Sequence, residues 1–246
     1  MKKLALLLTG LLLSATTAAY EQCHTQLHYD IRVSSAALQV SDRGKTLYEI
    51  REDGFLSIAG EGLDLNAGQR ELTEQYAGEI AALVPRWIRM VSDALALAEN
   101  SLQLALGDTL GKDSAAVEKS TRALREARQS FARKTRPEDG VFTLYASEYN
   151  DVVDGLEEEL EGVFKSALGA VLSEIGSAIT SDDGSFAEKM EAFGRKMKHF
   201  GEEVGHAGHA LEQTGEELCA SMKEIRKLER DVSRQIPQLS EYPLFY

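Results

Sequence analysis

The length, composition and charge of the chain exclude several classes of protein before any motif is considered. The 246 residues include 43% hydrophobic and 7% aromatic residues, a balance typical of a globular protein rather than a disordered one. With 40 Asp and Glu against 27 Lys and Arg, the formal net charge is −13. Because nucleic acids and anionic lipids are bound by clustered positive charge, this balance argues against both as main partners.

Residues 1–19 have the pattern of a secretory signal peptide. Two lysines supply the positive start, residues 4–13 the apolar stretch, and Thr17-Ala18-Ala19 a small-residue cleavage site. The apolar stretch is too short to span a bilayer as a helix. We therefore expect cleavage after about Ala19, a periplasmic location and a mature chain that does not span a membrane.

The two cysteines, Cys23 and Cys219, both remain after removal of the signal peptide. In an oxidising compartment two cysteines pair by default, so we expect a Cys23–Cys219 disulfide. In the chain-entropy model a bond across so long a loop contributes at most about 5 kcal/mol. Two free thiols or an intermolecular bond are the alternatives.

Residues 20–65 form the first predicted structural segment, a small antiparallel β-meander. Short alternating apolar runs are separated by the turn signals Asp42-Arg43-Gly44 and Asp53-Gly54. A sheet of this size is not stable alone, so it should pack on the helices that follow.

From Asn66 the apolar spacing changes to that of a helix, and this pattern continues to residue 236. Asn66 and Gln69 make a plausible capping pair, and Pro85 should kink or interrupt the first helix. We expect helices at about 66–107, 114–134, 147–180 and 185–235, followed by an aromatic tail at 237–246. The tail should pack on the helical body, or alternatively be recognised by a partner.

These elements predict a mainly α chain. We expect an elongated antiparallel helical bundle, or coiled-coil hairpin, that carries the small N-terminal meander. Residues 66–236 would make up the bundle.

The last predicted helix carries the most regular pattern of the chain. Apolar residues recur every seven positions in two rows: Met190, Met197, Val204, Leu211, Leu218, Ile225 and Val232, with Phe186, Phe193, Phe200 and Ala207. Glycine recurs at the same interval in the last two predicted helices. The repeats favour coiled-coil-like packing within a hairpin, or in a homo-oligomer through residues 185–235; an ordinary bundle helix is the alternative.

The chemistry-bearing residues give little support for an enzyme. The chain has no motif typical of nucleophilic, phosphate-binding or zinc-protease chemistry, so we expect no enzyme, no catalytic residue and no cofactor. Glu202, His206 and His209 are spaced by four and three residues and could hold a divalent transition metal. A solvated histidine face is the alternative.

A run of basic residues between Arg122 and Arg136 has the composition of an anion-binding site. Acidic residues at 148–161 follow it across a predicted turn, so two antiparallel helices would bring the opposite charges together. We expect internal ion pairs rather than ligand binding.

Several segments together resemble a known bacterial family, most clearly from about Cys23 to Trp87. They are the signal peptide, Cys23, Ile50-Arg51-Glu52-Asp53-Gly54-Phe55-Leu56, Leu63-Asp64-Leu65-Asn66 with Gln69-Arg70, Tyr76 and Pro85. This set is similar to the YggN-like family, a periplasmic family of Gram-negative bacteria classed as a domain of unknown function. The resemblance implies an exported protein, and it implies no activity, substrate or catalytic residue.

Together these features predict a non-enzymatic periplasmic envelope protein. The rows of Met and Phe in the last helix suit an adaptable surface, so binding of a protein partner or an amphiphile through helical apolar surface is the leading hypothesis. Core packing of the same side chains is the alternative. The second hypothesis is a periplasmic metal-binding protein that uses Glu202, His206 and His209.

Overall fold

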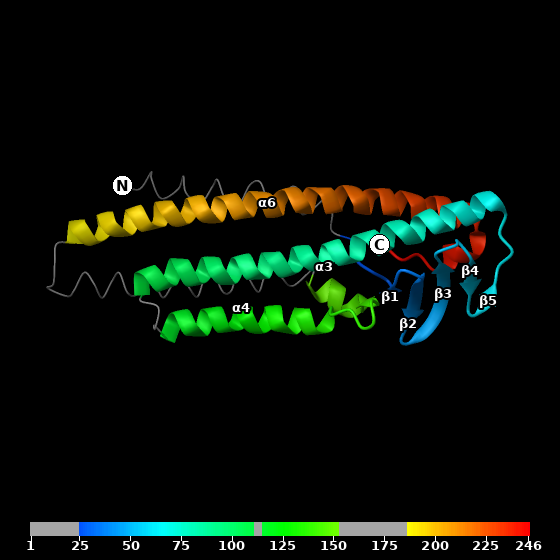
Figure 1. Ribbon diagram of the computed structural model, residues 1–246, viewed down its shortest axis with the longest axis horizontal. Helices are drawn as coiled ribbons and strands as arrows, with labels where there is room; N and C mark the ends of the chain where they lie inside the picture. Colours follow the sequence, from blue (N-terminus) through cyan, green and yellow to red (C-terminus); the bar gives the residue numbers. More distant parts are fainter. Residues whose placement is uncertain (1–24, 111–114, 153–185) are drawn as a thin grey trace. The chain divides into compact units, whose positions relative to one another are not determined.

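The computed structural model describes residues 25–110, 115–152 and 186–246, and these form two compact units (Figure 1). The first unit contains residues 25–88, 135–152 and 212–246. The second contains residues 89–110, 115–134 and 186–211. The predicted signal peptide and most of the helix predicted at 147–180 lie outside the described residues.

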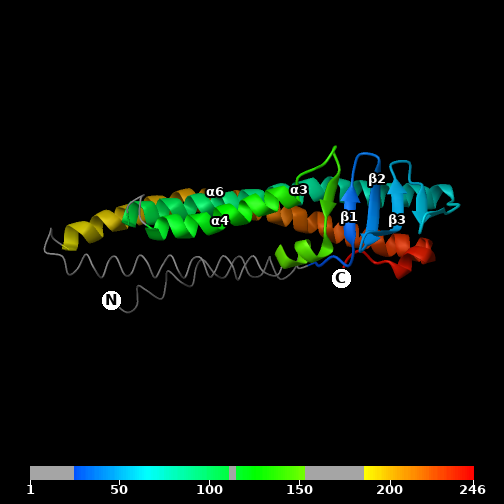
Figure 2. The same ribbon diagram turned by 90° about the horizontal axis from the view of Figure 1, so that it is seen from below.

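The first unit contains one antiparallel sheet, and Figure 2 shows strands β1, β2 and β3 side by side. Five strands follow one another in the chain: β1 (Asp30–Val33), β2 (Ala37–Asp42), β3 (Lys45–Arg51), β4 (Leu56–Ile58) and β5 (Glu61–Gly62). A sixth strand, β6 (Phe142–Leu144), comes from a later part of the chain and pairs with β1. The strand order is therefore β5-β4-β3-β2-β1-β6.

The prediction of a mainly α fold, an elongated helical bundle or coiled-coil hairpin with a small N-terminal meander, is wrong. The chain contains a six-stranded sheet that is completed by residues far from the N-terminus. A turn precedes the missed strand: Asp139 and Gly140 have φ of 51° and 78°, and Glu138 and Val141 exchange both backbone hydrogen bonds. From the sequence alone this turn is expected to be a break between helices, because a strand of three residues has no visible periodicity.

The same kind of turn closes two other hairpins of the sheet. Arg43 and Gly44, between β2 and β3, have φ of 49° and 79°, and Ala59 and Gly60, between β4 and β5, have φ of 51° and 86°. Two successive positive φ values define the type I′ turn, whose twist matches that of paired strands. The turn predicted at Asp42-Arg43-Gly44 is confirmed.

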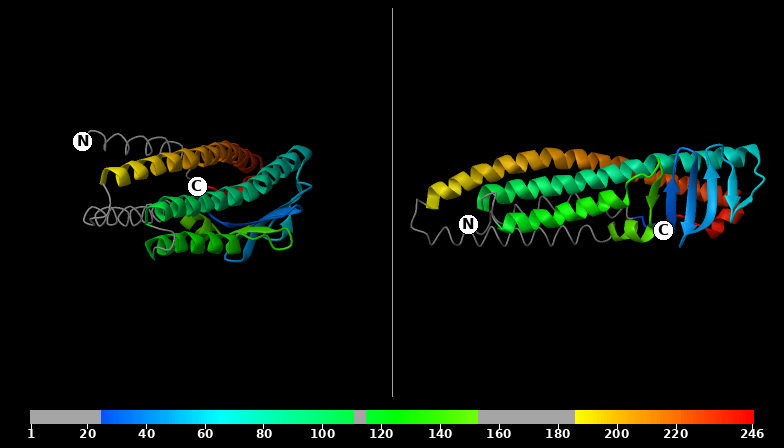
Figure 3. Two further views of the ribbon diagram at one scale, coloured as in Figure 1. Left: turned by 60° about the vertical axis from the view of Figure 1, so that its left-hand side comes forward. Right: turned by 60° about the horizontal axis from the view of Figure 1, so that its bottom comes forward.

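One face of the sheet packs on two helices of the same unit, the first part of α3 (Ala67–Leu110) and the last part of α6 (Phe186–Gln235) (Figure 3). The side chains of this core are buried at 8% exposure or less: Ile31, Val33, Leu38, Val40, Tyr48, Ile50 and Leu56 from the sheet, and Tyr76, Ile80, Leu83, Ile225 and Val232 from the helices. Burial of these apolar side chains drives the packing of the helices on the sheet.

Helix α3 begins where the sequence predicts. The amide of Gln69 donates to Asn66 Oδ1 at 2.9 Å, and the amide of Asn66 donates to Gln69 Oε1 at 3.0 Å, so the predicted capping pair is confirmed. The helix continues through Pro85 to Leu110 without the predicted interruption.

The C-terminal tail pairs with the first described residues. After the 3-10 helix η1 (Pro237–Glu241), the amide of Tyr246 donates to the carbonyl of Gln26 at 3.1 Å, and the amide of His28 donates to Leu244 O at 3.0 Å. Leu244 is fully buried. The tail therefore packs within its own unit, with an extended segment rather than a helix as its main-chain partner.

In the second unit a buried carboxylate joins α3 to α4 (Ala115–Lys134). Glu99 is 7% exposed and accepts from Arg125 Nε at 2.9 Å and from Arg128 Nε at 3.0 Å. A buried charge must be paired to be tolerated, so this clamp is part of the packing. These two arginines thus pair with the preceding helix, whereas most of the predicted acidic partners at 148–161 lie outside the described residues, so that pairing stays a prediction.

The loop between β3 and β4 approaches α3 very closely at Gly54. This residue is buried, has φ of 72°, and its carbonyl accepts a hydrogen bond from the hydroxyl of Thr73 at 2.7 Å. A Cβ atom at this position would lie 2.3 Å from the carbonyl oxygen of Arg70. Glycine is therefore required both by the backbone conformation and by the contact with the helix.

Gly54→Ala is expected to destabilise the protein by about 2–4 kcal/mol, because the added methyl group would push the β3–β4 loop away from backbone that cannot yield. Gly60→Ala is the matched control, since Gly60 also has a positive φ but has no atom within 4 Å of a built Cβ. It should cost about 1 kcal/mol. Urea unfolding followed by circular dichroism measures both, and equal losses would contradict the argument from the contact.

Cys219 lies half-buried on α6 and is not a free thiol, whereas its predicted partner Cys23 lies outside the described residues. The Cys23–Cys219 pairing stays a prediction. It fits the described neighbours: Met222, one turn along α6 from Cys219, lines a small apolar cavity together with Leu27, which follows Cys23 by four residues.

We expect non-reducing mass spectrometry of peptides to recover a Cys23–Cys219 cross-link within one chain. Reduction should then lower the free energy of unfolding, by at most about 5 kcal/mol, because the unfolded chain regains the freedom of a long loop. Recovery of both residues as free thiols from the exported protein would contradict the pairing.

Candidate functional site

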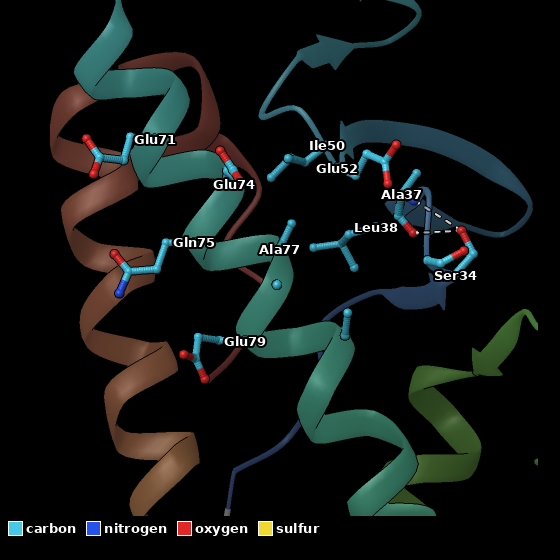
Figure 4. Close-up of a pocket in the computed structure, with 13 residues that line it drawn as sticks. Ser34, Ala37, Leu38, Ile50, Glu52, Glu71, Glu74, Gln75, Ala77 and Glu79 are labelled. Atoms are coloured by element: carbon cyan, nitrogen blue, oxygen red, sulfur yellow. Dashed lines mark hydrogen bonds between the residues drawn. The ribbon is translucent and has the colours of Figure 1, made fainter.

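A groove of about 600 Å³ lies in the first unit, between the sheet and the first turns of α3 (Figure 4). One wall consists of residues from the β1–β2 loop, from β2 and from the end of β3 with the residue after it. The other wall is α3 between residues 71 and 81. The lining residues are Ser34, Ser35, Ala37, Leu38, Ile50, Glu52, Glu71, Glu74, Gln75, Ala77, Gly78, Glu79 and Ala81. Residues far apart in the sequence thus make one surface depression.

The floor of the groove is apolar and its margin is acidic. In Figure 4 Leu38 and Ile50 extend from the strands toward α3, where Ala77 faces them. Glu52 lies on the sheet side. Glu71, Gln75 and Glu79 lie in the same view along the flank of α3 that is turned away from the strands.

The acidic side chains of the groove have no counter-charge. Glu52, Glu71, Glu74 and Glu79 are exposed, and none has a hydrogen bond or ion pair through its carboxylate in the part of the chain that the structure describes. Residues 71–85 contain no Lys or Arg. Because no described ion pair compensates these charges, they favour a negative potential over the groove.

Gly78 keeps the middle of the groove open. It lies inside α3, where a glycine costs about 1 kcal/mol relative to alanine. A Cβ atom there would meet no atom within 4 Å, so packing does not require the glycine. Its effect is to leave room on the helix surface between the acidic side chains.

A second polar cluster, buried in the same unit, joins Tyr48 of β3, Tyr76 of α3 and Glu229 of α6. The Tyr76 hydroxyl donates to Glu229 Oε1 at 3.2 Å, and the amide of Leu244 donates to the same oxygen at 2.5 Å. Burial raises the pKa of Glu229, and the hydrogen bonds from Leu244 and Tyr76 offset part of this effect. Burial also raises the pKa of both tyrosines, which therefore stay protonated.

This cluster is a structural connection between distant parts of the unit. A separate apolar cavity of about 20 Å³, lined by Ile80, Leu83, Trp87 and their neighbours, does not include Tyr48, Tyr76 or Glu229. The half-buried Glu229 carboxylate holds the C-terminal tail on α3 and α6.

The predicted metal residues lie on α6 in the second unit. His209 is exposed, and the side chains of Glu202 and His206 lie outside what the structure describes. No group of three His, Cys, Asp or Glu side chains able to hold a metal is found among the described residues. The site at Glu202, His206 and His209 stays a prediction.

The structure describes the apolar row of the last helix, predicted to offer a binding surface, only in its C-terminal part. In the first unit its members Leu218, Ile225 and Val232 are at most 6% exposed and offer no open surface, whereas Leu211, in the second unit, is half-buried. The side chains of Met190 and Met197 are outside the described set. The groove on α3, by contrast, was missed; its only sequence signals are an interior glycine and a stretch of helix without basic residues.

No described helix is long and apolar enough to cross a membrane.

Glu229→Gln is expected to be at least as stable as the unchanged protein at neutral pH. A raised pKa means that the folded state binds the proton more tightly, so the carboxyl stabilises the fold below its unfolded pKa and loses that contribution as pH rises through its folded pKa. Glutamine keeps the acceptor oxygen without the charge. The difference in unfolding free energy between the two proteins should therefore shrink on acidification.

Glu229→Leu is the companion variant, because it removes the acceptor and leaves the amide of Leu244 and the hydroxyl of Tyr76 without their partner. It should cost about 1–3 kcal/mol at every pH. Chemical unfolding in a series of buffers measures both variants, and a gap between the glutamine variant and the unchanged protein that widens in acid would show that the pKa is lowered instead.

Comparison with known proteins identifies the family of the chain but assigns no activity to it. No curated protein and no solved structure matches the chain. Residues 23–245 match the model of a family described as "Protein of unknown function (DUF2884)". The expected membership in a family of unknown function is confirmed, although the match does not test the YggN-like name. Since the match extends over most of its length, the chain belongs to the DUF2884 family of proteins of unknown function.

Proposed function

We propose that this protein is a non-enzymatic binding protein, exported to the periplasm, that holds a segment of a partner protein in the groove between the sheet and α3. The groove carries the proposal: it is about 600 Å³ in volume, open to solvent, and lined by an apolar floor with acidic margins. Ligand-binding surfaces commonly combine an apolar floor with a few polar groups that fix orientation.

The supporting features are those of a binding surface rather than a catalytic one. The exposed carboxylates of the groove make no hydrogen bonds among the described residues, whereas catalytic acids and bases are usually held by a partner. Glu229, the one described carboxyl in this unit whose pKa is raised, is half-buried and bonded to Tyr76 and Leu244. Export rests on the signal-peptide pattern of residues 1–19.

Site-specific photocrosslinking in intact cells tests this function. A photoreactive phenylalanine analogue replaces Glu74, which lines the groove, and in a matched protein it replaces Glu216, which is exposed on α6 of the same unit outside the groove. We expect a discrete crosslinked product from position 74 and none from position 216. Identical products from both positions, or none from position 74, would contradict the proposal.

The Gly78→Leu variant provides a second test of the contact surface in the same crosslinking experiment. The side chain has room at its Cβ and removes a helix glycine, so the variant should fold and gain up to about 1 kcal/mol of stability. It fills the middle of the groove, and the product from position 74 should therefore be lost. Persistence of that product in a stably folded Gly78→Leu protein would show that the groove is not the contact surface.

A further inference from the structure

We propose that the occupant of the groove is an extended segment of a partner protein that carries lysine or arginine side chains. This inference rests on the function proposed above and specifies its ligand. Three features of the groove support this occupant: its charge, the spacing of its carboxylates and the small side chains of its floor.

The charge of the groove requires a cationic occupant. Four exposed carboxylates surround it, and no basic residue lies within the stretch of α3 that lines it. Some carboxylates among the described residues are paired: Glu99 accepts from two arginines and Asp53 from Arg51. The groove carboxylates have no such partner among the described residues, so their charge is available to a ligand.

The spacing of the carboxylates excludes a single metal ion and fits an extended cation. Glu71 and Glu79 are two turns apart on α3, which separates their backbone positions by about 12 Å along the helix axis. No three described carboxylates or histidines converge closely enough to ligate one ion. An extended polypeptide advances about 3.3 Å per residue, so about four residues reach from one end of this acidic margin to the other.

The floor of the groove favours a polypeptide over a small free polyamine. Ala77, Gly78 and Ala81 present little side chain on α3, and Ala37 does the same on the strand side. Small residues on both walls leave space for the backbone and side chains of a bound polypeptide, which is bulkier than the unbranched methylene chain of a polyamine. Because the carboxylates are exposed, each ion pair is weak, and the apolar contacts have to supply much of the affinity.

Fluorescence anisotropy with a labelled octapeptide of alternating lysine and alanine tests the inference on the full mature chain. We expect binding that weakens as salt is raised and that is reduced about fivefold to thirtyfold in the double variant Glu71→Gln, Glu74→Gln. The matched control Asp64→Asn, Glu216→Gln has the same net charge but alters exposed carboxylates outside the groove, and it should bind as the unchanged protein does. Gly78→Leu should also weaken binding.

The opposite results overturn the inference. They are an equal loss in the groove variant and in the control, no binding of the basic peptide, or displacement of the peptide by spermine at matched charge concentration, which would identify a free polyamine as the ligand. If position 74 still gives its crosslinked product in cells while the peptide fails to bind, the partner is not basic and only this inference falls. If both fail, the proposed function falls with it.

Discussion

The first unit depends on a carboxylate that is partly removed from water and is bonded by groups from distant parts of the chain. Glu229 of α6 accepts from the Tyr76 hydroxyl of α3 and from the amide of Leu244 in the C-terminal tail. A third part of the chain is tied in by Asn150, whose side chain exchanges two hydrogen bonds with the backbone of Leu27. The unit is therefore held by long-range contacts, and no one of its segments would bury its own polar groups alone.

Local features of this fold were predictable because their causes lie within a few residues of sequence. The reciprocal bonds of Asn66 and Gln69 start α3 where the capping pattern places it, and the Arg43-Gly44 turn follows from Gly44, which adopts a positive φ without steric cost. The strand β6 was not predictable in this way. Its three residues are stabilised by pairing with β1, more than 100 residues earlier, which leaves no periodic trace.

The groove could not be predicted from the sequence for the same reason. Its two walls come from residues 34–52 and 71–81, and only the packing of the sheet on α3 brings them together. Read along the chain, Glu71, Glu74 and Glu79 have the pattern of a solvated helix face, which is what most such patterns are. Their lack of a counter-charge becomes informative only when the neighbouring surface is known. The interior glycine was the one local feature out of keeping with a plain helix.

The acidity of the chain therefore has two distinct physical roles. The buried Glu99 and the half-buried Glu229 are bound by donors and hold elements together, so they are not available to a ligand. The groove carboxylates keep their hydration and can exchange it for a cation at little cost, which gives fast, salt-dependent association but little affinity for each charge. Tight binding at such a surface has to come from contact with the floor formed by Ala77 and Gly78. The charge of a partner would then set how fast it associates, and its fit to the floor would set how tightly it binds.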